Sequence, residues 1–319
     1  MGYRSEKETQ EKTVKRLRLG LVIGTCILFA ALCVVSAFVP VESWKYYWDL
    51  PSVSLKEEGE LRIHYLDVEN GGCALVELPD GKNVIVGGGA DDGKARENAF
   101  RFLNALKIKT VDALIIPNTA RNGVGILREL VAFYNVKAAY VTELESNNTE
   151  YASFLTELQR KNAPVYEASE GVLFFENGGY SLRILFPLRE GDSAFPTVLA
   201  LSYMGVDVLL GDGYGQDVFD ALRIEKDLGL WEKWGVVLEK FDVVQTPIDI
   251  DPEDLTEFAM DFSADTVIFS CRGGEGYMPS NELLNALSAI GSRAYRTDEN
   301  GYISVTIDEN GYTVTTEKE

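Results

Sequence analysis

Residues 61–89, which read LRIHYLDVENGGCALVELPDGKNVIVGGG, decide the fold of this chain. The runs 61–68 and 73–79 are rich in apolar and β-branched residues, a composition typical of strands. Asp80-Gly81 is a strong hairpin-turn pair, and it leads directly into a third strand-like run at 83–89. The stretch therefore predicts the start of a β-rich domain with a hairpin near its beginning.

Beyond this stretch, strands and helices alternate. Apolar runs bounded by turn residues predict buried strands, and apolar residues at helical spacing predict the helices between them. Two sheets with helices outside both accommodate this order of elements. The pairs Asn300-Gly301 and Asn310-Gly311 are typical of tight turns, so the last residues are expected to form a run of hairpins. The expected strands are 111–117, 138–143, 181–187, 197–205, 206–213, 242–247 and 265–271, and the expected helices are 92–107, 124–134, 149–162, 251–262 and 280–291.

Four segments give the chain a resemblance to a known family. They are the opening stretch, VDALIIP (111–117), LALSYMGVDVLLGDG (199–213) and YRTDENGYISVTIDENGYTV (295–314). With these segments, residues 58–319 resemble the metallo-β-lactamase fold, and specifically the β-lactamase-like C-terminal domain of ComEC-type DNA-uptake proteins. The resemblance implies an α/β fold class, in which one domain forms a four-layer αββα sandwich.

In that family, one or two zinc or manganese ions turn water into hydroxide and clamp a phosphodiester. The metal ligands are imidazoles and carboxylates, which come from loops at strand ends. Here the scaffold strands match the family, whereas the ligand loops depart from it. Gly72 and Gly87 stand where the family has aspartates, and Met278 stands where it has a histidine. The HxHxDH motif falls on Asn118-Thr119-Ala120-Arg121-Asn122-Gly123, and the PHHGS motif falls on Pro247-Ile248-Asp249-Ile250-Asp251.

Of the family's metal-ligand positions, only Asp212 keeps a ligating side chain. One carboxylate does not hold a catalytic transition metal against water. The resemblance therefore implies a degenerate, metal-free pseudoenzyme without cofactor or catalytic residues, which works as an interaction or sensing module. Arg121 would either pair with a carboxylate such as Asp212 or help to bind a small anion or carbohydrate. The vestigial cleft would be formed by Asn118, Arg121, Asn122, Asp212 and Asp249.

Two alternatives stay open. The carboxylates of Asp212, Asp249 and Asp251 offer oxygen ligands that suit Mg²⁺ or Ca²⁺, and such a rebuilt site would support a metal-dependent hydrolase or phosphodiesterase. Asp251 is also a good N-cap in front of Pro252, so helix capping explains it equally directly. The other alternative is a purely structural envelope subunit, with a sealed cleft and an exposed apolar patch elsewhere.

His64 is the only histidine in the chain, which excludes every site built from several histidines. It lies in the middle of a strand-like run, where a packed or sheet-surface histidine is expected. A Ser-His-Asp triad would have to use His64, and the sequence has no GxSxG motif to supply its serine. Cys73 and Cys271, which lie outside the apolar N-terminal run, are expected to be buried free thiols, with one disulfide as the alternative.

Residues 19–39, LGLVIGTCILFAALCVVSAFV, form an uncharged run that is long enough to cross the hydrocarbon core of a membrane. Basic residues outnumber acidic ones before this run, which favours a cytoplasmic N-terminus and an external main domain. A cleaved signal peptide ending near 35–37 is the alternative, although the run exceeds the length usual for such peptides. The sequence thus predicts a basic cytoplasmic tail (1–18), a transmembrane helix (19–39), a tether (40–57) and a metallo-β-lactamase-like domain (58–319).

The formal net charge of the chain is −20, from 30 Lys and Arg residues against 50 Asp and Glu residues. This charge repels the nucleic-acid backbone at long range, so direct DNA binding is not expected. A single span also cannot form a channel by itself. We therefore expect a single-pass protein of the cell membrane, held through residues 19–39, with a protein partner in an envelope or uptake assembly.

Overall fold

The computed structural model describes residues 2–318, apart from 145–146, 169–172, 178, 187–188, 191–192, 195–196, 212–215, 230–238, 249, 275 and 277. The side chains of residues 2–14, 37–38, 121, 173–177, 186, 189–190, 193–194 and 216 also lie outside the description. The chain divides into two compact units, residues 1–48 and residues 49–319, and each is described by itself.

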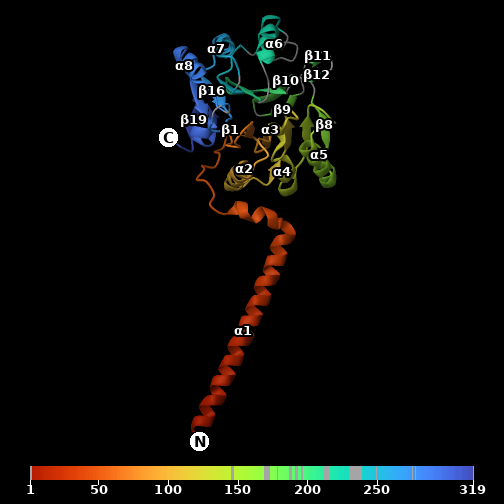
Figure 1. Ribbon diagram of the computed structural model, residues 1–319, viewed down its shortest axis with the longest axis vertical. Helices are drawn as coiled ribbons and strands as arrows, with labels where there is room; N and C mark the ends of the chain where they lie inside the picture. Colours follow the sequence, from red (N-terminus) through yellow and green to blue (C-terminus); the bar gives the residue numbers. More distant parts are fainter. Residues whose placement is uncertain are drawn as a thin grey trace. The chain divides into compact units, whose positions relative to one another are not determined.

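The N-terminal unit consists of the long helix α1 (Gly2–Phe38) and the 3₁₀ helix η1 (Val41–Tyr47) (Figure 1). Within α1, Lys15–Ser36 has a mean hydropathy of 2.5, and none of its most apolar window is buried. By length and composition this segment is a candidate membrane span, a criterion that an N-terminal signal sequence also satisfies. It includes most of the predicted span at residues 19–39.

Two large sheets form the second unit. One sheet is antiparallel from β19 to β3 and parallel from β3 to β8, while the other is antiparallel from β9 to β14 and parallel from β14 to β17. The first sheet has the order β19 (Gly311–Thr316), β18 (Ile303–Asp308), β1 (Leu61–Tyr65), β2 (Cys73–Glu77), β3 (Asn83–Gly87), β5 (Ala113–Ile116), β7 (Ala139–Val141) and β8 (Val165–Glu167). The second has the order β17 (Arg293–Arg296), β16 (Thr266–Phe269), β15 (Val243–Thr246), β14 (Val206–Leu210), β13 (Val198–Tyr203), β10 (Tyr180–Phe186) and β9 (Leu173–Asn177).

The main core lies between the two sheets. Side chains alternate along each strand, so Ile63 and Tyr65 of β1 join this core while Arg62 and His64 face the opposite side of the sheet. Leu182, Leu201 and other residues of the second sheet meet them there. The predicted hairpin is confirmed, because β2 and β3 pair antiparallel and Gly81 in their turn has a positive φ of 82°. Short two-stranded sheets are made by β4 (Thr110–Val111) with β6 (Asn135–Val136) and by β11 (Arg189–Glu190) with β12 (Ser193–Ala194).

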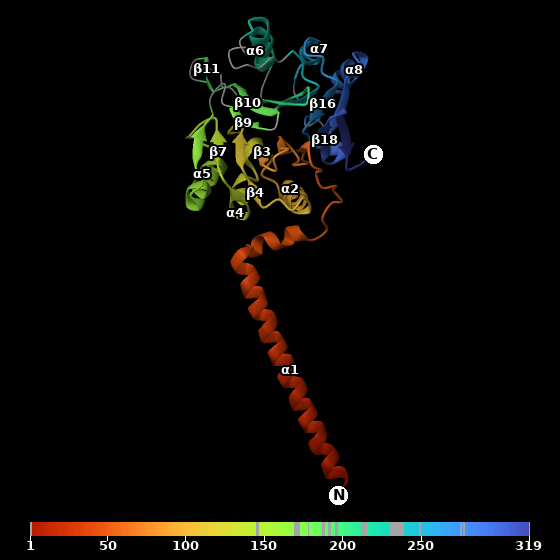
Figure 2. The same ribbon diagram turned by 180° about the vertical axis from the view of Figure 1, so that it is seen from behind.

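Helices cover the outer face of each sheet, as Figures 1 and 2 show. The helices α2 (Gly93–Ala105), α4 (Leu127–Phe133) and α5 (Thr149–Lys161) lie beside the first sheet. The helices α6 (Gln216–Asp227), α7 (Pro252–Asp261) and α8 (Asn281–Ala289) pack on the second sheet through a separate apolar cluster. This order of layers confirms the predicted α/β class and the four-layer αββα sandwich.

The final segment departs from the prediction at one of its two turns. Asn310-Gly311 does join β18 and β19 into a hairpin, but Asn300 ends a short helix, α9 (Thr297–Asn300). The strand before α9, β17, pairs in parallel with β16 in the second sheet, whereas β18 belongs to the first. The prediction of a hairpin at Asn300-Gly301 is therefore wrong, because a positive-φ glycine ends a helical turn as readily as it closes a hairpin.

Candidate functional site

Loops from both sheets border one edge of the sandwich. The backbone N–H of Thr197, just before β13, donates to the carbonyl of Pro117, just after β5, over 2.7 Å. Since β13 begins at the edge where β14 ends, this bond brings together the carboxyl ends of the parallel strands of the two sheets. Such strand ends are where α/β proteins place their sites. We call the loops 66–72, 87–92 and 117–126 the strand-end loops.

Backbone hydrogen bonds hold the three strand-end loops together. The N–H of Gly89 donates to the carbonyl of Gly72 over 3.1 Å. On the other side, the N–H of Gly125 donates to the carbonyl of Gly89 over 2.9 Å, and that of Ile126 donates to Gly88 over 3.0 Å. The loop after β3 thus lies between the other two, with its polar backbone groups paired.

This packing requires glycine at several positions. A Cβ on Gly71 would lie 1.8 Å from the backbone oxygen of Asn122, and a Cβ on Gly87 would lie 2.3 Å from the backbone oxygen of Gly72. Both glycines also have a positive φ, of 86° and 79°. A Cβ on Gly125 would lie 2.1 Å from the backbone of Ala90 and Asp91. The aspartate that the family carries at the position of Gly87 therefore has no room in this loop packing.

The structure describes only some of the residues of the predicted vestigial cleft. Asn118 is half-buried, and its Oδ1 accepts a hydrogen bond from the N–H of Ala120 over 2.9 Å, which closes a local turn. Asn122 contributes its backbone oxygen to the contact with Gly71. Arg121 begins the short helix α3 (Arg121–Val124), but its side chain lies outside the description, as do Asp212 and Asp249. The predicted pairing of Arg121 with Asp212 stays a prediction.

The residues present do not fit the metal centre of the family. Within the part of the chain that the structure describes, His, Cys, Asp and Glu side chains form no group of three that could hold a metal ion. Asp251, a candidate ligand, caps α7: its Oδ1 accepts from the N–H of Glu253 over 2.9 Å, and Pro252 follows at the first helical position. The capping explanation of Asp251 is thus the one the geometry supports.

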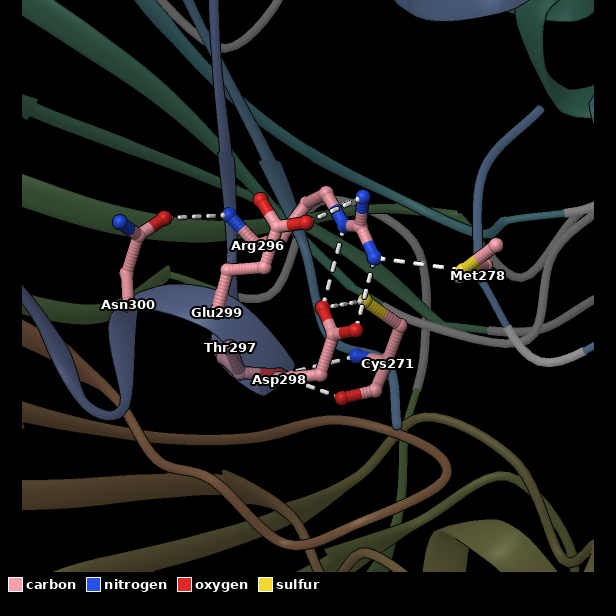
Figure 3. A network of polar contacts seen from close by, with 7 residues as sticks. All are labelled: Cys271, Met278, Arg296, Thr297, Asp298, Glu299 and Asn300. Carbon is pink, nitrogen blue, oxygen red and sulfur yellow. Dashed lines mark hydrogen bonds and ion pairs between the residues drawn. The ribbon is translucent and has the colours of Figure 1, made fainter. Parts of the chain in front are cut away.

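A polar network that the sequence analysis did not identify lies at the ends of β16 and β17 (Figure 3). The Arg296 guanidinium binds the Asp298 carboxylate in a bidentate manner, with Nε to Oδ1 at 3.1 Å and Nη2 to Oδ2 at 2.7 Å. Arg296 Nη2 also donates to the sulfur of Met278 over 3.4 Å. Met278, the residue expected in place of a histidine ligand, therefore contacts a guanidinium cation.

Cys271 belongs to the same network and is fully buried. Its thiol donates to Asp298 Oδ1 over 3.1 Å, and its backbone N–H and carbonyl both bond the hydroxyl of Thr297 at 2.9 Å. Burial, and then the hydrogen bond to Asp298, raise the pKa of the Cys271 thiol to about 12. The group is therefore a thiol at neutral pH, which is not the form that attacks electrophiles or binds metals. Cys73 is also buried, so both predicted free thiols are confirmed.

A second feature missed from the sequence is a cavity of about 240 Å³ beside Asp67, in the strand-end loop 66–72. Asn98 Nδ2 donates to Asp67 Oδ2 over 3.2 Å, and Lys94 pairs with the neighbouring Glu69. Burial is the main reason that the pKa of Asp67 is raised, although the Lys94 charge works against it. The burial of Asp67 depends on its packing beside α2, which the local sequence does not reveal, so this cavity was not predicted.

No family model matches the chain, and no curated protein matches it by sequence. Solved structures do resemble it. CmlA, a diiron β-hydroxylase from Streptomyces venezuelae, is 12% identical over 76% of this chain and 53% of its own length, with a TM-score of 0.46. A protein described as a metal-dependent hydrolase from Parabacteroides distasonis is 10% identical over 77% and 97% of the two chains, with a TM-score of 0.46. The metallo-β-lactamase SMB-1 is 15% identical over 62% and 81%, with a TM-score of 0.36.

The chain spans about half the length of CmlA. The assignment of a metallo-β-lactamase-like fold rests on the sheet order and layers of this chain itself. The activities named for these similar proteins are not assigned to this chain.

Proposed function

We propose that this chain is a membrane-anchored, extracytoplasmic relative of the ComEC β-lactamase-like domain, whose strand-end loops serve interaction or sensing and not metal-dependent hydrolysis. The observation that carries the proposal is the packing of the strand-end loops through Gly71, Gly87 and Gly125. In the family that the chain resembles, metal-ligating carboxylates point from these loops into a cleft. Here the backbones of the three strand-end loops pack directly against one another. At the neighbouring strand ends, the Asp298 carboxylate is bound by the Arg296 guanidinium, so its oxygens already have a cationic partner.

The test is the metal content of the full chain, purified in detergent and dialysed against Zn²⁺, Mn²⁺ and Mg²⁺ in turn. Elemental mass spectrometry should find far less than one metal ion per chain in every case. The variant Asp212→Ala should give the same content as the natural chain. Glu309→Ala, at an exposed position on the hairpin turn, is the matched control for loss of one carboxylate.

A stoichiometric metal ion that Asp212→Ala removes and Glu309→Ala retains would contradict the proposal. The rebuilt carboxylate site and phosphodiesterase activity would then become the leading explanation. A low metal content in all three proteins leads instead to a search for protein partners in membranes that contain the full chain.

A further inference from the structure

The outer face of the first sheet carries an unusual trio of side chains on the neighbouring strands β18, β1 and β2. His64 lies directly opposite Ser304 in the pairing of β1 with β18. Its Nδ1 lies 2.7 Å from Ser304 Oγ, and its Nε2 lies 3.0 Å from Glu77 Oε1. The only histidine of the chain is thus bonded on one side to a hydroxyl and on the other to a carboxylate, at hydrogen-bond distance in both cases.

The roles of the two ring nitrogens depend on the tautomer, and the carboxylate partner favours one of them. An ionised carboxylate only accepts hydrogen bonds, so His64 Nε2 carries the proton and donates it to Glu77. In the neutral ring Nδ1 is then the acceptor, and the Ser304 hydroxyl donates to it. A hydroxyl bonded to an imidazole that a carboxylate orients is the arrangement that activates a serine as a nucleophile.

The imidazole is held in place on its flat side as well. Only 3% of His64 is exposed, and the ring of Phe102 on α2 packs edge-on against it, with centroids 5.1 Å apart. Because this base is already fixed in position, little entropy is lost in ordering it when a reaction begins.

A cavity of about 220 Å³ lies next to the serine and the histidine. The segment Ser52–Ser54 borders it, held in place by two bonds: Arg62 Nη1 donates to the carbonyl of Ser54 over 2.8 Å, and the Tyr302 hydroxyl donates to the carbonyl of Ser52 over 2.9 Å. Hydroxyl groups dominate the lining, and the Arg62 guanidinium, which pairs with Glu60, also borders the cavity. The hydroxyl side chains that line it are Ser52, Ser54, Tyr302, Ser304, Thr306, Thr315 and Thr316.

We propose that Ser304 is a nucleophile, activated by His64 and oriented through Glu77, that accepts the acyl group of a small carboxylic ester bound in this cavity. A cavity of this size admits a short acyl group such as acetyl, and its hydroxyl lining suits an ester of a hydroxyl-rich alcohol. The inference does not depend on the function proposed for the strand-end loops.

The reaction balances with water as the only co-reactant. Ser304 Oγ forms a bond to the ester carbonyl carbon while its proton passes to His64 Nδ1, and Glu77 stabilises the imidazolium that results. The bond from that carbon to the alcohol oxygen then breaks, and the departing oxygen takes the proton from Nδ1. Water repeats the sequence on the seryl ester, so an ester and water become an acid and an alcohol.

The test uses the full chain in detergent with a fluorophosphonate, which labels activated serines, and with p-nitrophenyl acetate as a small ester. Peptide mass mapping of the natural chain should place one adduct on Ser304. Ser304→Ala should abolish labelling and ester turnover, and His64→Gln should lower both at least about 100-fold. Ser153→Ala, an exposed serine on α5, is the matched control and should change neither.

The proposal is overturned if the natural chain acquires no adduct on Ser304, or if His64→Gln labels as fast as the natural chain. Mapping the natural chain decides the question even where a variant does not fold. Glu77→Gln, which keeps a hydrogen-bond partner for His64 without its charge, should lower turnover less than His64→Gln; equal turnover to the natural chain would also contradict the role given to Glu77.

Discussion

At the scale of single residues, the strand-end loops depend on the absence of a side chain at their glycines. Gly71 and Gly87 bring two carbonyl groups to within contact distance of their own Cα atoms. Any side chain there would have to push backbone aside, and the positive φ angles would add strain. The same two features that make the loops close-packed also remove the positions from which a carboxylate could reach a metal ion.

Asp67 gives a prediction about pH at this scale. Burial raises its pKa, so the folded chain favours the protonated carboxyl, and its contribution to stability is complete at low pH and is lost as the pH rises through the raised value. Asp67→Asn should therefore raise the free energy of unfolding at pH 7, by less than about 1 kcal/mol because the group is only partly buried. Below about pH 4 the two chains should unfold alike.

Urea unfolding at the two pH values measures this effect. Glu97→Gln, which removes one carboxylate from the helix α2 that packs beside Asp67, is the control and should show no such gain at pH 7. If Asp67→Asn is less stable than the natural chain at pH 7, the interaction of Asp67 with Lys94 outweighs the cost of burial, and the prediction is wrong.

At the scale of elements, the predicted cap at Asp251 is confirmed, since its side-chain oxygen caps α7. Helices α2, α5 and α8 begin in the same way, at Asp92, Asn148 and Ser280. The turn at Asn300-Gly301 was mistaken because its local signal is shared by two structures. Only the pairing of β17 with β16, which depends on distant residues, selects the helical turn.

The cap of α7 allows capping and metal binding to be separated. Asp251→Ala should lower the free energy of unfolding by about 0.5–2 kcal/mol, because the N–H of Glu253 loses its acceptor. Asp251→Asn keeps an oxygen acceptor and should restore most of that stability. Thermal or urea unfolding of both variants is the measurement. Were Asp251→Asn as damaging as Asp251→Ala, the charge of the carboxylate and not its capping bond would matter.

At the scale of the whole molecule, the sandwich could be predicted because its evidence is spread over many strands. The order of apolar runs and turns survives the loss of individual residues, so the layers were correct even where one hairpin was not. The candidate sites could not be predicted in the same way. Ser304 and His64 lie 240 residues apart and meet only because β18 pairs with β1.

The proposed topology predicts which parts of the chain a protease reaches. In intact cells, an external protease should degrade residues 58–319 and leave a tag on the N-terminal tail protected, because basic residues before the span favour the cytoplasm. The control is a chain without residues 19–39, whose domain should be protected until the cells are lysed. Protection of the domain in the natural chain would reverse the orientation, and a mature N-terminus close to residue 38 would identify a cleaved signal peptide.

The pairing of β1 with β18 also determines when, during synthesis of the chain, the domain can complete its fold. The first strand of the sandwich leaves the ribosome long before the strand that completes its sheet, and β19 follows later still. Until then Ile63 and Tyr65 have no finished core, and one edge of β1 is open to other chains. A nascent chain that stalls before Ile303 thus cannot finish the domain, however well its earlier hairpin has formed.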